Sequence, residues 1–168
     1  MQRHPNTVIF ITSTVPIRLY ATNFDLLTNQ TDTVTVLPDT MADKNYIITL
    51  PTASRRIYSS LQYHIIHFLP INFEIPTKII IKISYKINKT VTFELTTTNS
   101  SKYIHYFAQS GTVSRLPRTY YIEASQPILI TTALTCTPIL STAFAPSGCD
   151  FAAFMPPPIF KQGFFIQI

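Results

Sequence analysis

The sequence is poor in charge, glycine and cysteine, and it contains no tryptophan. Charged residues make up 12% of the chain, about half the share of roughly 25% that is usual in globular domains. Three glycines stand against thirteen prolines, and tight hairpin turns rely on glycine at positive φ. We therefore expect most strand connections to be longer loops or loops marked by proline.

Long apolar runs are also missing. No stretch reaches the roughly 18 apolar residues that a membrane-spanning helix needs, so the sequence predicts no membrane span. The N-terminal run over residues 6–14 is rich in threonine and too short for the apolar part of a secretory signal. It is typical of a strand. A secreted form would need a leader outside these residues, and we expect the chain to be a truncated part of a longer product.

Basic residues exceed acidic ones by five, but they are spread along the chain. Lys78, Lys82 and Lys86 are spaced by four, so they lie on one side of an extended strand. A solvated strand face explains them, and contact with an anionic surface is the alternative. Because a nucleic-acid-binding face needs clustered charge, the sequence predicts no nucleic-acid partner.

Strand-forming residues fill the chain at short intervals. In segment 77–87, polar residues alternate with isoleucines 79, 81 and 83, which is the pattern of a half-buried strand. Segment 55–69 has a weak helical spacing, but we expect a strand there. These patterns predict an all-β fold in one domain over residues 1–168, either an antiparallel β-sandwich-like fold or tandem small β modules. The other predicted strands are 32–38, 45–51, 89–98, 119–125 and 127–134, and in segment 89–98 Val91, Phe93 and Leu95 should face inward.

A weak internal similarity links residues 13–23 with residues 124–134. Pro16 aligns with Pro127, and each is followed by isoleucine and an apolar strand pattern. Shared composition alone or a duplicated structural unit would explain it.

Cys136 and Cys149 are the two cysteines of the chain, and twelve residues separate them. If they pair, closure of a loop of this size contributes about 3 kcal/mol in the chain-entropy model. In a reducing compartment they would instead be small buried hydrophobic residues. Three Asn-x-Ser/Thr triplets, at Asn29, Asn88 and Asn99, favour the secretory route and a disulfide.

Residues for catalysis or for a cofactor are not grouped in the sequence. His64 and His67 should point to opposite faces of a strand, which argues against a shared metal ion. The carboxylates are scattered, and no phosphate-binding glycine loop or nucleophile motif occurs. We therefore expect no enzyme activity, no metal site and no cofactor.

The chain resembles the N-terminal domain family of IgGFc-binding protein over most of its length, most specifically in its C-terminal segment. Segments 15–23, 32–38, 44–51 and 77–87 look like earlier elements of the same domain. That family has a Ser-x-x-Pro strand running to a cysteine, then a loop, Cys-Asp, a hydrophobic stretch and a proline pair. Where the family has Trp-Gly after the prolines, this chain has Phe160 and Gly163. The matching residues are Ser125, Pro127, Ile128, Cys136, Cys149, Asp150, Pro156, Pro157 and Phe164.

The resemblance implies a structural corner and an extracellular role. A strand starting at Pro127 would be tied to a loop by Cys136 and Cys149, Asp150 would fix the following turn, and Pro156 and Pro157 would stiffen the exit. The chain would then be an interaction or adhesion domain, outside the cell or at its surface, that recognises another extracellular protein or glycoprotein. The alternative is a self-assembling structural or matrix protein, since long strands of low charge favour edge-to-edge association.

Overall fold

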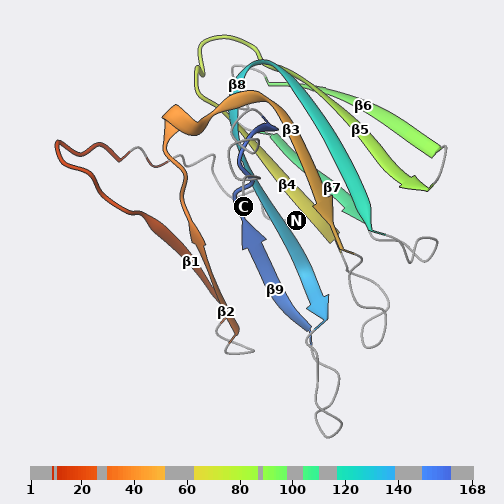
Figure 1. Ribbon diagram of the computed structural model, residues 1–168, viewed down its shortest axis with the longest axis horizontal. Coiled ribbons are helices and arrows are strands. Elements are labelled where there is room, and N and C mark those ends of the chain that lie inside the picture. Colours follow the sequence, from red (N-terminus) through yellow and green to blue (C-terminus); the bar gives the residue numbers. More distant parts are fainter. Residues whose placement is uncertain are drawn as a thin grey trace, which may run out of the picture.

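The computed structural model describes residues 9, 11–25, 30–51, 63–86, 89–97, 104–109, 117–138 and 149–159. The predicted all-β fold is confirmed: these residues form antiparallel strands, with a short 3-10 turn, η1 (Asp39–Met41), before the third strand (Figure 1). The strands are β1 (Tyr20–Asp25), β2 (Gln30–Thr35), β3 (Asp43–Leu50), β4 (Tyr63–Pro70), β5 (Lys78–Lys86), β6 (Lys89–Thr96), β7 (Ile104–Gln109), β8 (Arg118–Pro138) and β9 (Cys149–Phe154).

Strand β8 organises the main sheet. Its first half pairs with β3 on one edge and β5 on the other, so that Tyr120 lies opposite both Ile48 and Ile83. Its second half pairs with β4 and β9, and Ala133 lies opposite both Ile65 and Ala153. Strands β6 and β7 extend the sheet beyond β5 and β4. β8 therefore joins two strand groups, as strands do when they cross between the layers of a sandwich.

The prediction of two separate strands at 119–125 and 127–134 is wrong, because both segments belong to β8. Proline has no N–H to give to a ladder. At Pro127 this loss is tolerated, since the strand changes partners there, from Ala124 opposite Ile79 to Ile128 opposite Pro70. The Pro127 carbonyl still accepts a hydrogen bond from the Ile71 N–H, at 3.1 Å.

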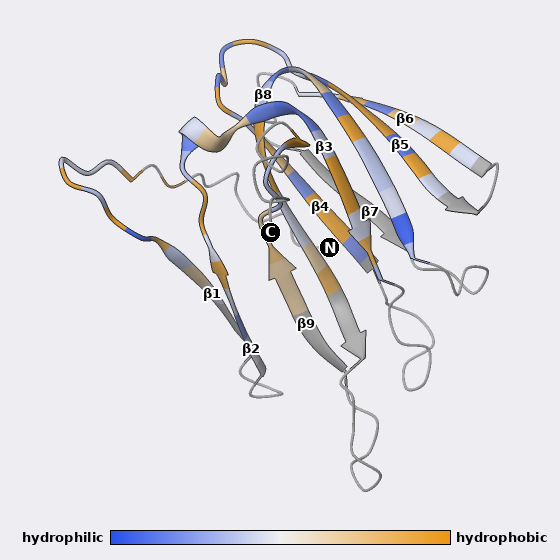
Figure 2. Cartoon of the chain, viewed as in Figure 1, coloured by the Kyte–Doolittle hydropathy of each residue, from blue (hydrophilic) through white to orange (hydrophobic). Residues whose placement is uncertain are grey.

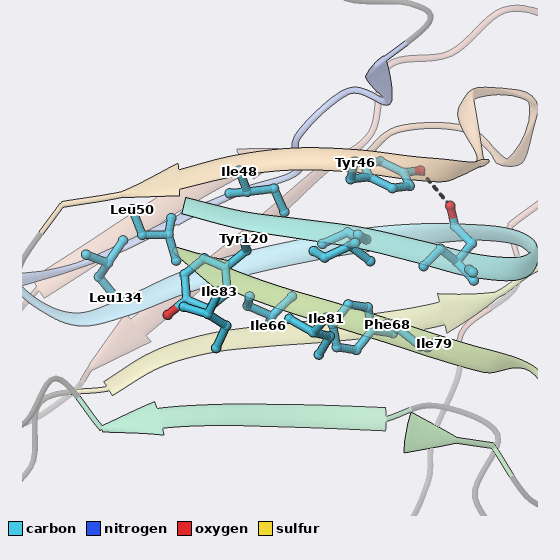
Figure 3. Packing of buried hydrophobic residues seen from close by; sticks show 14 residues of the cluster. Tyr46, Ile48, Leu50, Ile66, Phe68, Ile79, Ile81, Ile83, Tyr120 and Leu134 are labelled. Carbon is cyan, nitrogen blue, oxygen red and sulfur yellow. Dashed lines mark hydrogen bonds between the residues drawn. The ribbon is translucent and has the colours of Figure 1, made fainter. Parts of the chain in front are cut away.

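One hydrophobic core lies between the two strand groups (Figure 3). It combines Ile66 and Phe68 of β4 with isoleucines of β5 and with residues of β3 and both halves of β8. A core shared in this way is that of a β-sandwich rather than of tandem modules. The buried members are Tyr46, Ile48, Leu50, Ile66, Phe68, Ile79, Ile81, Ile83, Tyr120, Ile122, Ala124, Ile128, Ile130 and Leu134.

The β5–β6 hairpin confirms the predicted alternation (Figure 2). Ile79, Ile81 and Ile83 are buried, while Lys78 and Lys82 are exposed on the other face. Lys78 Nζ lies 2.9 Å from Glu94 Oε1 of β6, an exposed pair that contributes little to stability. Val91 and Phe93 lie opposite these isoleucines, as predicted, but they remain 37% and 40% exposed. The core face of β6 is therefore only partly covered.

Candidate interaction surfaces

The N-terminal strands form a separate two-stranded sheet, which we call the ribbon, beside β9 (Figure 1). β1 and β2 pair along their whole length, from Tyr20 opposite Thr35 to Asp25 opposite Gln30. The Val36 N–H extends the ladder by donating to the Leu19 carbonyl, at 2.9 Å. Among the described residues β1 pairs only with β2, so its outer edge is open. Two-stranded ribbons are marginally stable by themselves.

Residues 11–19, which we call the arm, precede the ribbon and form no strand, so the strand prediction for 6–14 is wrong where the structure describes it. The Ser13 hydroxyl bends the chain: it donates to the Val15 carbonyl at 2.8 Å and accepts from the Val15 N–H at 3.3 Å. Pro16 then removes a ladder donor. A strand-like composition is insufficient here without a neighbouring strand.

The arm carries large apolar side chains in an exposed position. Val15 is 63% exposed, Ile17 54% and Tyr20, the first residue of β1, 56%. In the similar segment of β8, Ile128 follows Pro127 and is fully buried. The same local pattern is therefore part of the core in β8 and uncovered in the arm. The sequence did not predict the exposure of these arm residues, although Pro16 and Ile17 align with Pro127 and Ile128.

The ribbon touches the main sheet beside β9. An Asp32 carboxylate oxygen accepts a hydrogen bond from the Ala153 N–H, and the Leu37 N–H lies 3.3 Å from Met155 Sδ. Because the Ala153 N–H reaches Asp32, it points away from β8, toward the outer edge of β9. Asp32, Val34 and Val36 are half-buried, while Thr33 and Thr35 between them are exposed. One face of β2 therefore covers the β9 edge without joining its ladder.

A second exposed apolar site lies on the outer face of the sheet. Ile47 of β3 and Tyr121 of β8 are cross-strand neighbours and are 40% and 46% exposed. Next to them, the Thr49 and Thr119 hydroxyls lie 3.0 Å apart. This pair is small and flanked by polar residues, so it is ordinary for a protein surface.

His64 is fully buried and has a structural role. Its Nε2 lies 2.8 Å from the Pro51 carbonyl, which can only accept, so Nε2 carries the proton. Its Nδ1 then accepts from the Tyr120 hydroxyl, also at 2.8 Å. Burial lowers the pKa of His64 below its usual range, although the Pro51 carbonyl raises it, and nearby Arg118 lowers it. The neutral ring ties β4 to β8 and to the end of β3. His67 is half-buried on the opposite face, as predicted.

Tyr46 ties β3 to the middle of β8. Its hydroxyl donates to the Ile128 carbonyl at 2.6 Å and accepts from the Asp43 N–H at 3.2 Å (Figure 3). Burial, the largest cause, raises the pKa of Tyr46 from 10.0 to about 12. The Tyr46 hydroxyl thus supplies a hydrogen-bond donor to the carbonyl of Ile128, the residue that follows Pro127.

Strands β8 and β9 place the two cysteines near one end of a strand pair. Cys149 lies opposite Pro138, two residues beyond Cys136. Such diagonal neighbours have Cα atoms about 7–8 Å apart, which is beyond the range of roughly 4.4–6.8 Å that a disulfide spans without backbone movement. A register shift between Leu134 and Thr137 changes this separation locally. Both side chains lie outside the described residues, so the disulfide stays a prediction.

The residues of the predicted corner are placed differently from the expectation. β8 runs through Pro127 instead of starting there, and Asp150 lies inside β9, opposite Thr137, instead of at a turn. Pro156 is buried and Pro157 half-buried in the irregular segment after β9, so these prolines pack against the domain. The glycosylation acceptors Asn29, Asn88 and Asn99 lie outside the described residues.

Within the part of the chain that the structure describes, no three His, Cys, Asp or Glu residues are grouped so that they could hold a metal ion. The same part contains no helix long and apolar enough to cross a membrane.

Comparison with known proteins shows the fold alone. No protein-family model matches the chain, and a search of curated proteins found no match. The fold is similar to that of a crystal structure of Thermotoga maritima protein 1070, with a TM-score of 0.50 and 11% sequence identity. The similarity covers 68% of this chain and 93% of the Thermotoga maritima chain. It supports the antiparallel all-β architecture.

Proposed function

We propose that the protein is a non-enzymatic β-domain that binds another extracellular protein or glycoprotein through its arm and the open edge of β1. The observation that carries this proposal is the exposure of Val15, Ile17 and Tyr20 next to a β1 edge that pairs with no strand in the described part of the chain. An extended segment of a partner can add to such an edge through main-chain hydrogen bonds, while apolar side chains beside it give specificity.

An extracellular setting is proposed on separate grounds. The resemblance to the IgGFc-binding protein N-terminal domain implies it. The three acceptor triplets and the two cysteines fit a secreted glycoprotein with one disulfide. No residue of the chain is assigned to immunoglobulin contact.

Replacing both Val15 and Ile17 by serine should weaken binding at least tenfold, because two exposed apolar side chains lose about 1.4 kcal/mol or more of burial on binding. We would measure Kd by surface plasmon resonance, with the immobilised chain and immunoglobulin G, its Fc fragment and a mucin-type glycoprotein as probes. Ile75→Ser is the matched control, since Ile75 is equally exposed, at 54%, in the β4–β5 connection. The proposal would be contradicted if the arm variant and the wild type had equal Kd values, or if Ile75→Ser lost as much affinity as the arm variant. It would also be contradicted if the wild type bound none of the probes.

A self-assembling structural protein is the second candidate. The partial exposure of Val91 and Phe93 on β6, an edge strand of the described sheet, favours it. Exposed apolar edges promote association between copies. Oligomers that grow with concentration and disappear in a Val91→Thr variant would support this candidate over the first.

A further inference from the structure

We propose that the β1–β2 ribbon is an exchangeable element, and that two copies of the chain form a dimer in which each ribbon lies on the β9 edge of the other copy. This inference goes beyond the proposed function and does not depend on any extracellular ligand.

The ribbon can move as a unit because its backbone hydrogen bonds lie within it. Six residue pairs join β1 to β2, and the Val36–Leu19 bond closes the same ladder. Detachment from the main sheet therefore breaks no ladder bond of either sheet. It breaks the contacts of the half-buried face of β2, including Asp32 to the Ala153 N–H and the Leu37 N–H to Met155.

The segment between the ribbon and β3 is built like a hinge. It contains Pro38 and the single 3-10 turn η1, in which the Met41 N–H bonds the Pro38 carbonyl and the Ala42 N–H bonds the Asp39 carbonyl, each at 2.9 Å. No residue of η1 is buried. Short 3-10 turns often serve as connectors or hinges, and this one can extend without uncovering the core.

A second copy is the partner that fits the vacated edge. Its ribbon carries the same Asp32 and the same half-buried face, so every contact of the closed chain can form again between chains. Exchange of identical elements is a low-cost route to a dimer for this reason. In Figure 1 the ribbon lies beside β9, and β2 continues through η1 into β3.

A mixed-isotope cross-linking experiment tests the exchange. Full-length chains with Val34→p-benzoylphenylalanine, half of them ¹⁵N-labelled, are unfolded, mixed and refolded at high concentration, and the dimer fraction is isolated and irradiated. Position 34 lies on the same side of β2 as Asp32, which touches β9. If the ribbons are exchanged and chains pair at random, about half of the links between position 34 and segment 149–155 should join a ¹⁵N-labelled chain to an unlabelled chain.

A longer hinge provides the second measurement. Insertion of six Gly/Ser residues between Asp39 and Thr40 should favour the closed chain. The dimer fraction of this variant, measured by light scattering, should be at least tenfold lower than that of the wild type. The same insertion between Ile87 and Asn88, and the Ile17→Ser variant, should leave the dimer fraction unchanged. Three results would each overturn the proposal. The first is that position 34 links only to segment 149–155 of a chain with the same isotope label. The others are a monomer at all concentrations up to about 1 mM and a dimer whose fraction does not respond to the hinge insertion. Loss of the dimer in Ile17→Ser would assign it to the arm and overturn exchange, while the glycoprotein assay tests the proposed function separately.

Discussion

Replacing Phe68 by alanine should destabilise the fold by about 3–5 kcal/mol, the largest effect that we expect from a single substitution. Phe68 of β4 is fully buried and faces the core shared by both strand groups (Figure 3). Its removal leaves a cavity that the two rigid strand groups fill only partly. Urea unfolding followed by circular dichroism would give the free energy of unfolding.

Ile47→Ala is the matched control for this prediction. Ile47 lies on the outer face of β3 and is 40% exposed, so its truncation should cost less than about 1 kcal/mol. If Phe68→Ala and Ile47→Ala lowered stability equally, the two strand groups would not share the core described above.

Replacing Tyr46 by phenylalanine should cost about 1–3 kcal/mol at pH 7, because the buried Ile128 carbonyl loses its donor. The same substitution should change the response to alkali. The pKa of Tyr46 is about 12 in the folded chain and 10.0 when unperturbed. The unfolded state therefore ionises first, and the Tyr46 hydroxyl should contribute a loss of about 2 kcal/mol of stability as pH rises from 10 to 12.

Urea unfolding at several pH values between 7 and 12 would check this prediction. In Tyr46→Phe the free energy of unfolding should fall less between pH 10 and 12 than in the wild type, because the contribution of this hydroxyl is missing. Tyr121→Phe is the control for removal of a tyrosine hydroxyl, since Tyr121 is 46% exposed on the outer face. A Tyr46→Phe variant as stable as the wild type, with the same alkaline loss, would contradict the assigned role of the hydroxyl.

Local pattern was sufficient to predict much of the fold. The alternation in segment 77–87 assigned Ile79, Ile81 and Ile83 to the core, and the structure buries all three. Alternation also placed Val91 and Phe93 on the same face. It gives the direction of a side chain but not what covers it, so their exposure was not predictable.

Other features depend on contacts between distant segments. No strand was predicted at β9, because Cys149–Phe154 contains alanines and an aspartate and becomes a strand only by pairing with β8. The continuity of β8 through Pro127 depends on the change of strand partners at that point. In the candidate site, the arm has the local sequence of a strand, but among the described residues it forms a backbone hydrogen bond to a neighbouring strand only at Leu19. Its exposed side chains could be identified only after the other strands were placed.

We propose that the chain is an extracellular interaction domain. Intact mass of the chain secreted from eukaryotic cells, with and without reduction and glycan removal, tests its setting most directly. The account predicts a gain of about 2 Da on reduction, for the two hydrogens added at Cys136 and Cys149, and a loss of mass on glycan removal from Asn29, Asn88 or Asn99. Free thiols together with unmodified asparagines would contradict the extracellular assignment and favour assembly inside the cell.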